Sequence, residues 1–538
     1  MADEERIREI ERIIDEYHKS ISFFRYYCHK RDQALWDVLA IYNKFALLET
    51  MGIVQTELWS QSAELFSFSQ VHDLMDSLNI AVQWIYEECD NEEGLAIEES
   101  LDDERNKMVI ELLTKHADKY AVIVDGFINY SRKNYTGRVD NNKVVFDCND
   151  FQYETFLADV GEESADEELM DFESISEKIK AVYSKLKGGG GITSEDNNGL
   201  LSISDDMHEM LLDIGEKHWQ MTSSLPQEWE FDGFSLEEFK CCWKELYVLS
   251  YSSILGVLVG ESKHKGMRVI GKMELKDYLV TTTGIASDRV NAIIALMTYD
   301  PSLKNTDIMY QPFIDLNNRV ILTSTLIVTG RPERNLLAII QKKRDSHYSK
   351  EVNGLEMIMG EELKTFLPKD VESRLSVKLG KDKPDIDLIA YDKENNYLLL
   401  VEMKWLIAAD SAREVLERQK DVDHGCAQME SIMQEVMKNP TSTIEHFFDY
   451  KTFNCPDLFW CVVTKHNVRT TNKLVPVIKL ATLEEMLQQL PYVSALHRLR
   501  NKEYSRMLPE NVSRGHKPVS YAGYVVEVPA LKCETPEV

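Results

Sequence analysis

The sequence predicts a multidomain protein whose mostly α-helical N-terminal and middle regions precede a C-terminal α/β core with a mixed sheet. The length of 538 residues suggests about two to four domains. Apolar residues recur at three- and four-residue steps in the first half of the chain, whereas strand-like and helix-like runs alternate nearer the C-terminus. We divide the chain into units at 1–187, 206–340, 341–490 and 491–538, with a glycine-rich linker at 188–205.

The N-terminal unit is predicted to be acidic and helical. Ile7, Ile10 and Ile14 recur at the spacing that places them on one face of a helix. Further helices are expected at 34–48, 74–88 and 167–186, with a short strand at 144–147. Four consecutive glycines at 188–191 interrupt these patterns and mark the linker.

The middle unit is predicted to be helical with one β-hairpin. Helices are expected at 207–221, 236–258 and 334–342, and strands at 309–316 and 320–328 that turn at Asn317-Asn318. The run at 246–260 comes nearest to a membrane span, but it is shorter than the ~18 apolar residues that a span needs, and it contains three serines. We therefore expect a buried helix there, and a soluble, cytoplasmic protein with no membrane segment or signal peptide.

The net charge of −30 is unevenly distributed. Residues 341–538 contain 28 basic and 30 acidic side chains, so residues 1–340 carry nearly all of the excess. An acidic surface repels phosphate groups, whereas the nearly neutral C-terminal part need not. Three interpretations of the acidic region stay open: a solubilising surface, a docking surface for a basic protein partner, and a shield that restrains the C-terminal unit.

The C-terminal unit combines helices and strands in alternation. Strands are expected at 375–379, 385–391, 397–405 and 458–464, and helices at 355–366 and 411–438. The apolar face of the first helix consists of Leu355, Ile358, Met359, Leu363 and Phe366. This order predicts a mixed sheet that is covered by helices.

Charged residues stand at the end of the most apolar predicted strand. Glu402 and Lys404 are two residues apart and therefore share a face. If the preceding strand turns back at 393–396, reflection about the turn places Asp387 opposite Glu402 and Asp385 opposite Lys404. Two opposed carboxylates repel each other unless a cation lies between them, and Mg²⁺ prefers carboxylate and water oxygens. An amine beside such an ion would stabilise charge that develops during phosphodiester hydrolysis.

This pattern resembles the PD-(D/E)XK nuclease superfamily, which includes many restriction endonucleases, Holliday-junction resolvases and nucleases of bacterial anti-phage defence. The resemblance rests on Pro384-Asp385-Ile386-Asp387, a hairpin, and Glu402-x-Lys404, and it covers about a quarter of the chain. It implies a restriction-endonuclease-like fold with Asp387, Glu402 and Lys404 as catalytic residues, the first two holding Mg²⁺ or Mn²⁺. It also implies a nucleic-acid substrate, with DNA favoured over RNA, and a role in defence against phage or foreign DNA.

The same resemblance suggests two auxiliary positions. Members often have a glutamate on the helix before the first strand, for which we choose Glu356 over the alternative Glu362; a solvated helix charge is an equal alternative for either. Many members also have a glutamine on the helix after the lysine, a position that Gln428 resembles. Helical spacing instead places Gln419 on the buried stripe, unless the helix breaks at Gly425.

Other functions remain open at this stage. The chain could be an inactive nuclease-fold scaffold or a nucleic-acid-binding subunit that does not cleave. A homo-oligomer is one expectation, since cutting two strands needs two active sites. No GxxxxGK[ST] phosphate loop is present in the sequence, so any ATP-derived energy would have to come from a partner.

Overall fold

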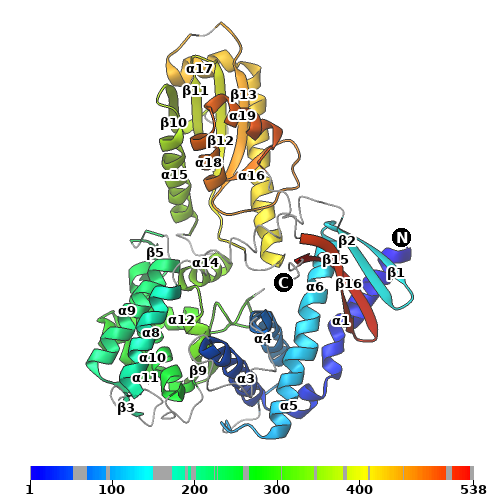
Figure 1. The fold of residues 1–538 in the computed structure, drawn as a ribbon, viewed down its shortest axis with the longest axis vertical. Helices are drawn as coiled ribbons and strands as arrows, with labels where there is room; N and C mark the ends of the chain where they lie inside the picture. Colours follow the sequence, from blue (N-terminus) through cyan, green and yellow to red (C-terminus); the bar gives the residue numbers. More distant parts are fainter. Residues whose placement is uncertain are drawn as a thin grey trace, which may run out of the picture.

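The computed structural model of the protein describes most of the chain, and its described residues form a multidomain α/β arrangement. These residues are 2–52, 69–91, 97–148, 172–187, 192–195, 201–222, 225–226, 228–258, 266–303, 306–343, 348–379, 385–409, 412–451, 453–504 and 512–533. A helical body forms the base, an α/β unit rises above it, and a small sheet lies at one side (Figure 1).

The N-terminal unit is helical up to its last two strands, as predicted. Its helices are α1 (Ala2–Glu16), η1 (Tyr17–Ser20), α2 (Ser22–Tyr27), α3 (Arg31–Gly52), α4 (Ser69–Glu88), α5 (Asp103–Glu111), the π-helical η3 (Leu112–Ala117) and α6 (Asp118–Ser131). The strands β1 (Tyr135–Asp140) and β2 (Lys143–Cys148) pair antiparallel, and β2 contains the predicted strand. A buried ion pair between Asp37 and Arg105, 2.5 Å apart, joins α3 to α5.

The end of the chain returns to this N-terminal unit. The strands β15 (Val512–Tyr521) and β16 (Tyr524–Cys533) form a hairpin, and β16 pairs parallel with β2 to give the sheet order β1-β2-β16-β15. Val526 and Val528 of β16 pack with Ile7, Ile10 and Phe127 of α1 and α6. Residues 491–538 are therefore not a single extension, because their last strands complete a core that begins with the first helix.

The middle unit starts earlier than its predicted boundary. Its elements are α8 (Phe172–Lys187), β3 (Ile192–Glu195), β4 (Leu201–Ile203), α9 (Asp205–Thr222), β5 (Glu230–Phe231), β6 (Phe234–Ser235), α10 (Leu236–Leu258), β7 (Met267–Gly271), α11 (Lys272–Thr283), α12 (Ser287–Met297), β8 (Phe313–Leu316), β9 (Arg319–Thr323), α13 (Ser324–Val328) and α14 (Pro332–Lys343). Helix α8 packs against α9, so it belongs here. The linker predicted at 188–205 contains the paired strands β3 and β4, and its four glycines lie outside the described residues.

The predicted hairpin of the middle unit is confirmed in its turn but not in its length. Strands β8 and β9 pair around Asn317, whose φ of 66° suits the turn. The expected second strand at 320–328 ends at Thr323, because the chain continues as α13. The apolar run at 246–260 lies within the helix α10 up to Leu258, with Ser250, Ser252 and Ser253 buried.

Charged side chains also bind the helices of the middle unit to one another. Glu216 of α9 accepts hydrogen bonds from Lys240 at 2.9 Å and Lys244 at 3.0 Å, both on α10. Burial opposes the charge on the carboxylate, but the two lysines outweigh it and lower the pKa of Glu216 to about 2. The ion pairs therefore contribute to the stability of the body.

The C-terminal unit is a three-layer α/β sandwich. Its strands are β10 (Val371–Lys378), β11 (Asp385–Asp392), β12 (Tyr397–Lys404), β13 (Asp457–Thr464) and β14 (Val477–Lys479), and its helices are α15 (Tyr348–Phe366), α16 (Ala412–Lys438), α17 (Pro440–Phe448), α18 (Leu480–Gln489) and α19 (Tyr492–Asn501). The sheet is mixed, because β10, β11 and β12 pair antiparallel while β12, β13 and β14 pair parallel. Helices α15, α18 and α19 cover one face, and α16 and α17 cover the other (Figure 1).

The predicted apolar face of α15 is correct at three of its five residues. Leu355, Met359 and Leu363 are buried, whereas Phe366 is only half-buried and Ile358 is 52% exposed. Ile358 lies one residue before Met359 and thus turns towards solvent when Met359 faces the sheet. The α15 helix also begins earlier than expected, at Tyr348.

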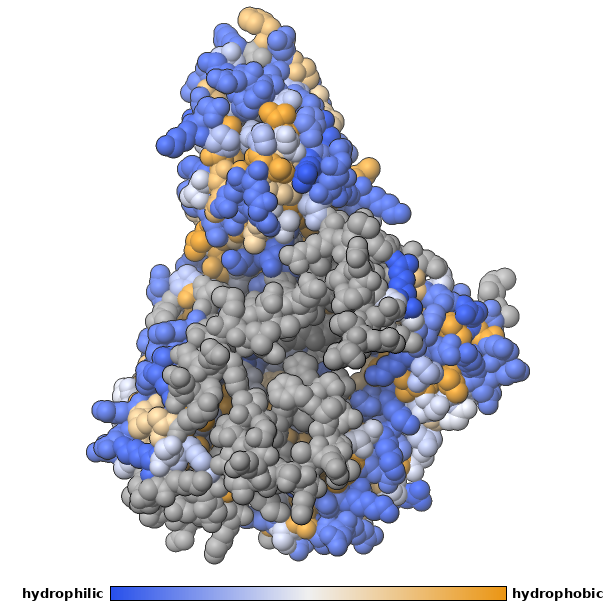
Figure 2. Space-filling model, in the orientation of Figure 1, coloured by the Kyte–Doolittle hydropathy of each residue, from blue (hydrophilic) through white to orange (hydrophobic). Residues whose placement is uncertain are grey.

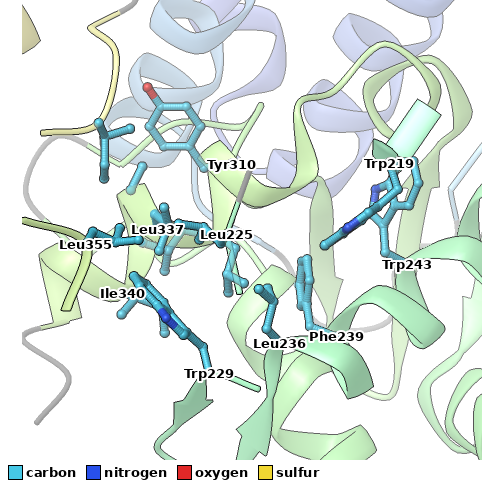
Figure 3. Close-up of a cluster of buried hydrophobic side chains, with 14 of the residues drawn as sticks. Trp219, Leu225, Trp229, Leu236, Phe239, Trp243, Tyr310, Leu337, Ile340 and Leu355 are labelled. Atoms are coloured by element: carbon cyan, nitrogen blue, oxygen red, sulfur yellow. The ribbon is translucent and has the colours of Figure 1, made fainter. Parts of the chain in front are cut away.

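The C-terminal unit joins the body through a packed core. Leu355 of α15 lies next to Leu337 and Ile340 of α14, and the same cluster continues to Trp229 (Figure 3). Beside it, the buried carboxylate of Glu414 at the start of α16 accepts hydrogen bonds from Tyr310 at 2.8 Å and Arg334 at 2.6 Å. Apolar and ionic contacts therefore join the two units on either side of the boundary predicted at 340–341.

The visible surface is mainly hydrophilic over the described residues, with apolar side chains in small groups between polar ones (Figure 2). None of the helices in the described ranges is both long enough and apolar enough to cross a bilayer.

Candidate functional site

The register of β11 and β12 brings the predicted site residues together. Leu388 pairs with Val401 and Asp392 with Tyr397, which is the register that reflection about the turn predicts. One further step along the strands places Asp387 opposite Glu402. Both side chains point to the face covered by α16, because they alternate with residues that face α15. The register therefore agrees with the predicted placement of these two carboxylates on one face.

Asp387 is held by the backbone of the neighbouring strand. Its Oδ2 accepts a hydrogen bond from the amide of Met403 at 2.7 Å. Burial raises the pKa of Asp387, and the Met403 amide partly offsets that effect. Asp385 pairs with Lys378 of β10, its carboxylate 3.6 Å from Lys378 Nζ, and its charge further raises the pKa of Asp387. The observed ladder of β11 and β12 ends at Leu388 and Val401, so the position of Asp385 opposite Lys404 stays a prediction.

Glu402 and Lys404 form a mostly buried ion pair. Lys404 Nζ donates to Glu402 Oε1 at 2.7 Å, and the side chains are 17% and 5% exposed for the lysine and the glutamate. Burial first, and the Asp387 carboxylate second, raise the pKa of Glu402 to about 7. Burial opposes the charge of Lys404, but Glu402 outweighs it and raises the lysine pKa. The group thus concentrates negative charge in a site that is largely closed to water.

Glu356 also reaches this site, whereas Glu362 does not. Glu356 Oε1 accepts a hydrogen bond at 3.2 Å from the amide of Trp405, directly after β12. Burial raises the pKa of Glu356, Lys404 lowers it, and Asp387 raises it, so the three groups lie within electrostatic reach. Glu362 is exposed on α15 and its charge acts on Glu484 instead.

The helix α16 passes the site without a break. The helix predicted at 411–438 is confirmed, and the alternative of a break at Gly425 does not occur, because α16 continues from Ala412 to Lys438. The glycine serves a different purpose: a Cβ there would lie 3.0 Å from Lys404 Cε and 3.2 Å from its Cγ. A glycine therefore lets the lysine stem lie against the helix. Gln428 lies one turn further along, while Gln419 lies near the apolar stripe.

One further residue beside Lys404 was missed by the sequence analysis. Thr464, the last residue of β13, pairs in register with Lys404. Adjacent residues in register on parallel strands point to the same face, so Thr464 lies on the α16 side with Val462. In the sequence it is one β-branched residue in the valine-rich strand 457–464, which gives no signal of a role.

Asp387, Glu402 and Glu356 supply oxygen donors of the type that Mg²⁺ selects, although their oxygens do not all lie within 4.8 Å of one another. One oxygen of each carboxylate accepts a hydrogen bond. The donor is the Met403 amide for Asp387, Lys404 Nζ for Glu402 and the Trp405 amide for Glu356. Their second oxygens have no hydrogen-bond partner among the described residues. Carboxylates that are fixed through one oxygen and open at the other match the oxygen ligands that Mg²⁺ selects.

A second group of ligand-type side chains needs no metal to explain it. Within the described ranges, His18 lies near Glu87 and Glu88, with Nε2 3.3 Å from the Glu88 carboxylate. The other ring nitrogen lies 2.6 Å from the carbonyl of Asp15, and the ring stacks on Trp84 at 4.9 Å. These contacts account for the histidine, so we do not assign a metal site to this group.

Comparisons of the chain with family models, with curated proteins and with solved structures gave no significant match. The functional argument therefore rests on the residues and their geometry.

Proposed function

We propose that the C-terminal unit is a restriction-endonuclease-like nuclease domain that hydrolyses phosphodiester bonds with Mg²⁺ or Mn²⁺. The observation that carries this proposal is the electrostatic coupling of Asp387, Glu402 and Glu356 with one another and with Lys404, which donates to Glu402. Keeping three carboxylates within electrostatic reach of one another in a mostly buried position is costly without a cation. The group lies at the end of β12, the central strand of the sheet.

Each residue of the site would have its own role in hydrolysis. Asp387 and Glu402 would hold the ion, with Glu356 as an auxiliary ligand. Bound there, the ion would supply a Lewis acid that draws charge from the phosphoryl oxygens. Lys404 would donate a hydrogen bond to the oxygen on which negative charge grows. The oxygen of water bonds to phosphorus as the water gives up a proton, the bond from phosphorus to the leaving sugar oxygen breaks, and that oxygen takes up a proton in return.

The charge distribution supports different roles for the C-terminal part and for residues 1–340. The nuclease unit belongs to the nearly neutral part of the chain, whereas residues 1–340 carry nearly all of the negative excess. We propose DNA as the substrate in preference to RNA, and defence against phage or foreign DNA as the setting. The acidic part would keep non-target nucleic acid away or dock a basic protein partner.

A cleavage panel tests the proposal. Purified protein is incubated with plasmid, linear duplex, single-stranded DNA and RNA, each with Mg²⁺, Mn²⁺ or EDTA. Cleavage of at least one substrate is expected with metal and not with EDTA, and Lys404→Ala should abolish it. If the wild-type protein cuts none of them and binds no metal, the proposal fails and an inactive scaffold is favoured.

A further inference from the structure

Lys404 has more hydrogen-bond donors than acceptors in the present arrangement. Its ammonium carries three N–H groups, and among the described residues only Glu402 accepts from it. The proposed function requires Glu402 to turn an oxygen towards a cation, and a carboxylate that binds a cation is a weaker acceptor. The ammonium would then need another acceptor in a site where it is only 17% exposed.

Thr464 supplies such an acceptor beside the lysine. Its side chain lies on the same face of the sheet, one strand away and in register. Thr464 is 1% exposed, and its hydroxyl has no hydrogen-bond partner among the described residues. A valine would fill the same space and suit a strand as well, as Val462 and Val463 do, so packing alone does not require a hydroxyl here.

Helix α16 holds the stem of Lys404 on the face of the sheet that Thr464 shares. Helix α16 packs across both β12 and β13, and Gly425 leaves the stem of Lys404 free of a Cβ contact. One turn along α16, the side-chain oxygen of Gln428 is also buried without a partner among the described residues. Two orphaned acceptors thus lie on the elements that flank an ammonium with unused donors.

We propose that Thr464 is a positioning residue for Lys404, its hydroxyl accepting a hydrogen bond from the ammonium when Glu402 turns to a divalent cation. The bond forms directly or through one buried water. Lys404 would thereby exchange one acceptor for another and stay directed at the reacting phosphate. This inference rests on the proposed function, because the exchange occurs only if the carboxylates bind a cation.

The test compares two threonines of the C-terminal unit. Thr464→Val removes the orphaned hydroxyl, and Thr464→Ser restores one. Thr443→Val is the matched control, because Thr443 is 9% exposed and its hydroxyl already donates to the Asn439 carbonyl at 3.3 Å. Three quantities are measured on the full-length variants: the unfolding temperature in EDTA, the Mg²⁺ affinity by calorimetry, and kcat on the substrate that the panel identifies.

The expected pattern separates a positioning role from a structural one. Thr464→Val should unfold in EDTA at the wild-type temperature or above, bind Mg²⁺ about five-fold more weakly and lower kcat about ten-fold with little change in KM. Thr464→Ser should restore both values towards wild type, and Thr443→Val should change neither Mg²⁺ affinity nor kcat. Wild-type Mg²⁺ affinity and kcat in Thr464→Val would overturn this inference alone, whereas a wild-type protein that neither binds Mg²⁺ nor cuts would overturn the proposed function as well.

Discussion

Gly425 offers a direct test of how α16 positions the lysine. An alanine there would bring its Cβ to 3.0 Å from Lys404 Cε, so the stem would have to shift by a few tenths of an ångström. Replacing a glycine within a helix gains about 0.5–1 kcal/mol, whereas overpacking costs about 1–3 kcal/mol. The net change in unfolding free energy should thus be between about zero and 2.5 kcal/mol of destabilisation. Gly425→Val should be more destabilising.

The matched control is Gly354→Ala in α15. No atom lies within 4 Å of a Cβ at Gly354, so this variant should gain about 0.5–1 kcal/mol of stability and leave cleavage unchanged. Gly425→Ala should lower the cleavage rate about ten-fold and Gly425→Val about a hundred-fold, because the amine is displaced from its working position. Urea unfolding and initial cleavage rates measure both effects. If Gly425→Ala gains stability and cuts like wild type, the helix does not position Lys404 and the argument is refuted.

Three more outcomes are expected. Lys404→Ala should abolish cleavage while the fold and Mg²⁺ binding largely persist, whereas Asp387→Ala should weaken Mg²⁺ binding as well. Calorimetry and the cleavage panel distinguish the two variants. Normal cleavage by both variants would contradict the proposed site. Glu216→Gln should cost at most about 3 kcal/mol at pH 7, since the folded pKa of about 2 lies below the ordinary value of 4.5. That stabilisation is complete above pH 4.5 and is lost as the pH falls towards 2, so unfolding curves of variant and wild type should converge in acid, and a constant difference would argue against the ion pairs. Gly126→Leu should prevent β16 from docking, because a Cβ there would lie 2.6 Å from Val528 Cγ1; unchanged proteolytic resistance of the C-terminal hairpin would speak against this.

The local parts of the fold could be predicted from sequence because their signals are local. Reflection about the turn at 393–396 gave the observed register of β11 and β12, since a hairpin fixes its own pairing. The same pairing predicts Asp387 and Glu402 on one face. The choice of Glu356 over Glu362 as the glutamate near the site agrees with the structure because the two positions are about 1.7 helix turns apart and therefore point in different directions.

The features that could not be predicted from the sequence depend on contacts between distant segments. Gly425 left a helix break open as an alternative, although a glycine can equally mark a close approach, and only the position of Lys404 decides between them. Thr464 could not be chosen from the sequence, because its role depends on the register of a parallel strand more than fifty residues away. Pairing of β2 with β16 has no local signal either, as the two strands are far apart in the sequence.

The pairing of β2 with β16 has a consequence for how the protein is made. A ribosome releases the N-terminal segment first, and domains usually fold in that order at about 5–20 residues per second. Here the sheet that begins with β1 and β2 waits for β15 and β16 to be synthesised, so the C-terminal α/β unit in between can close before the first unit does. Until then, the apolar side chains of α1 and α6 that later receive Val526 and Val528 stay uncovered. A product that stops before β15 would therefore carry a folded C-terminal α/β unit and an unfinished N-terminal unit.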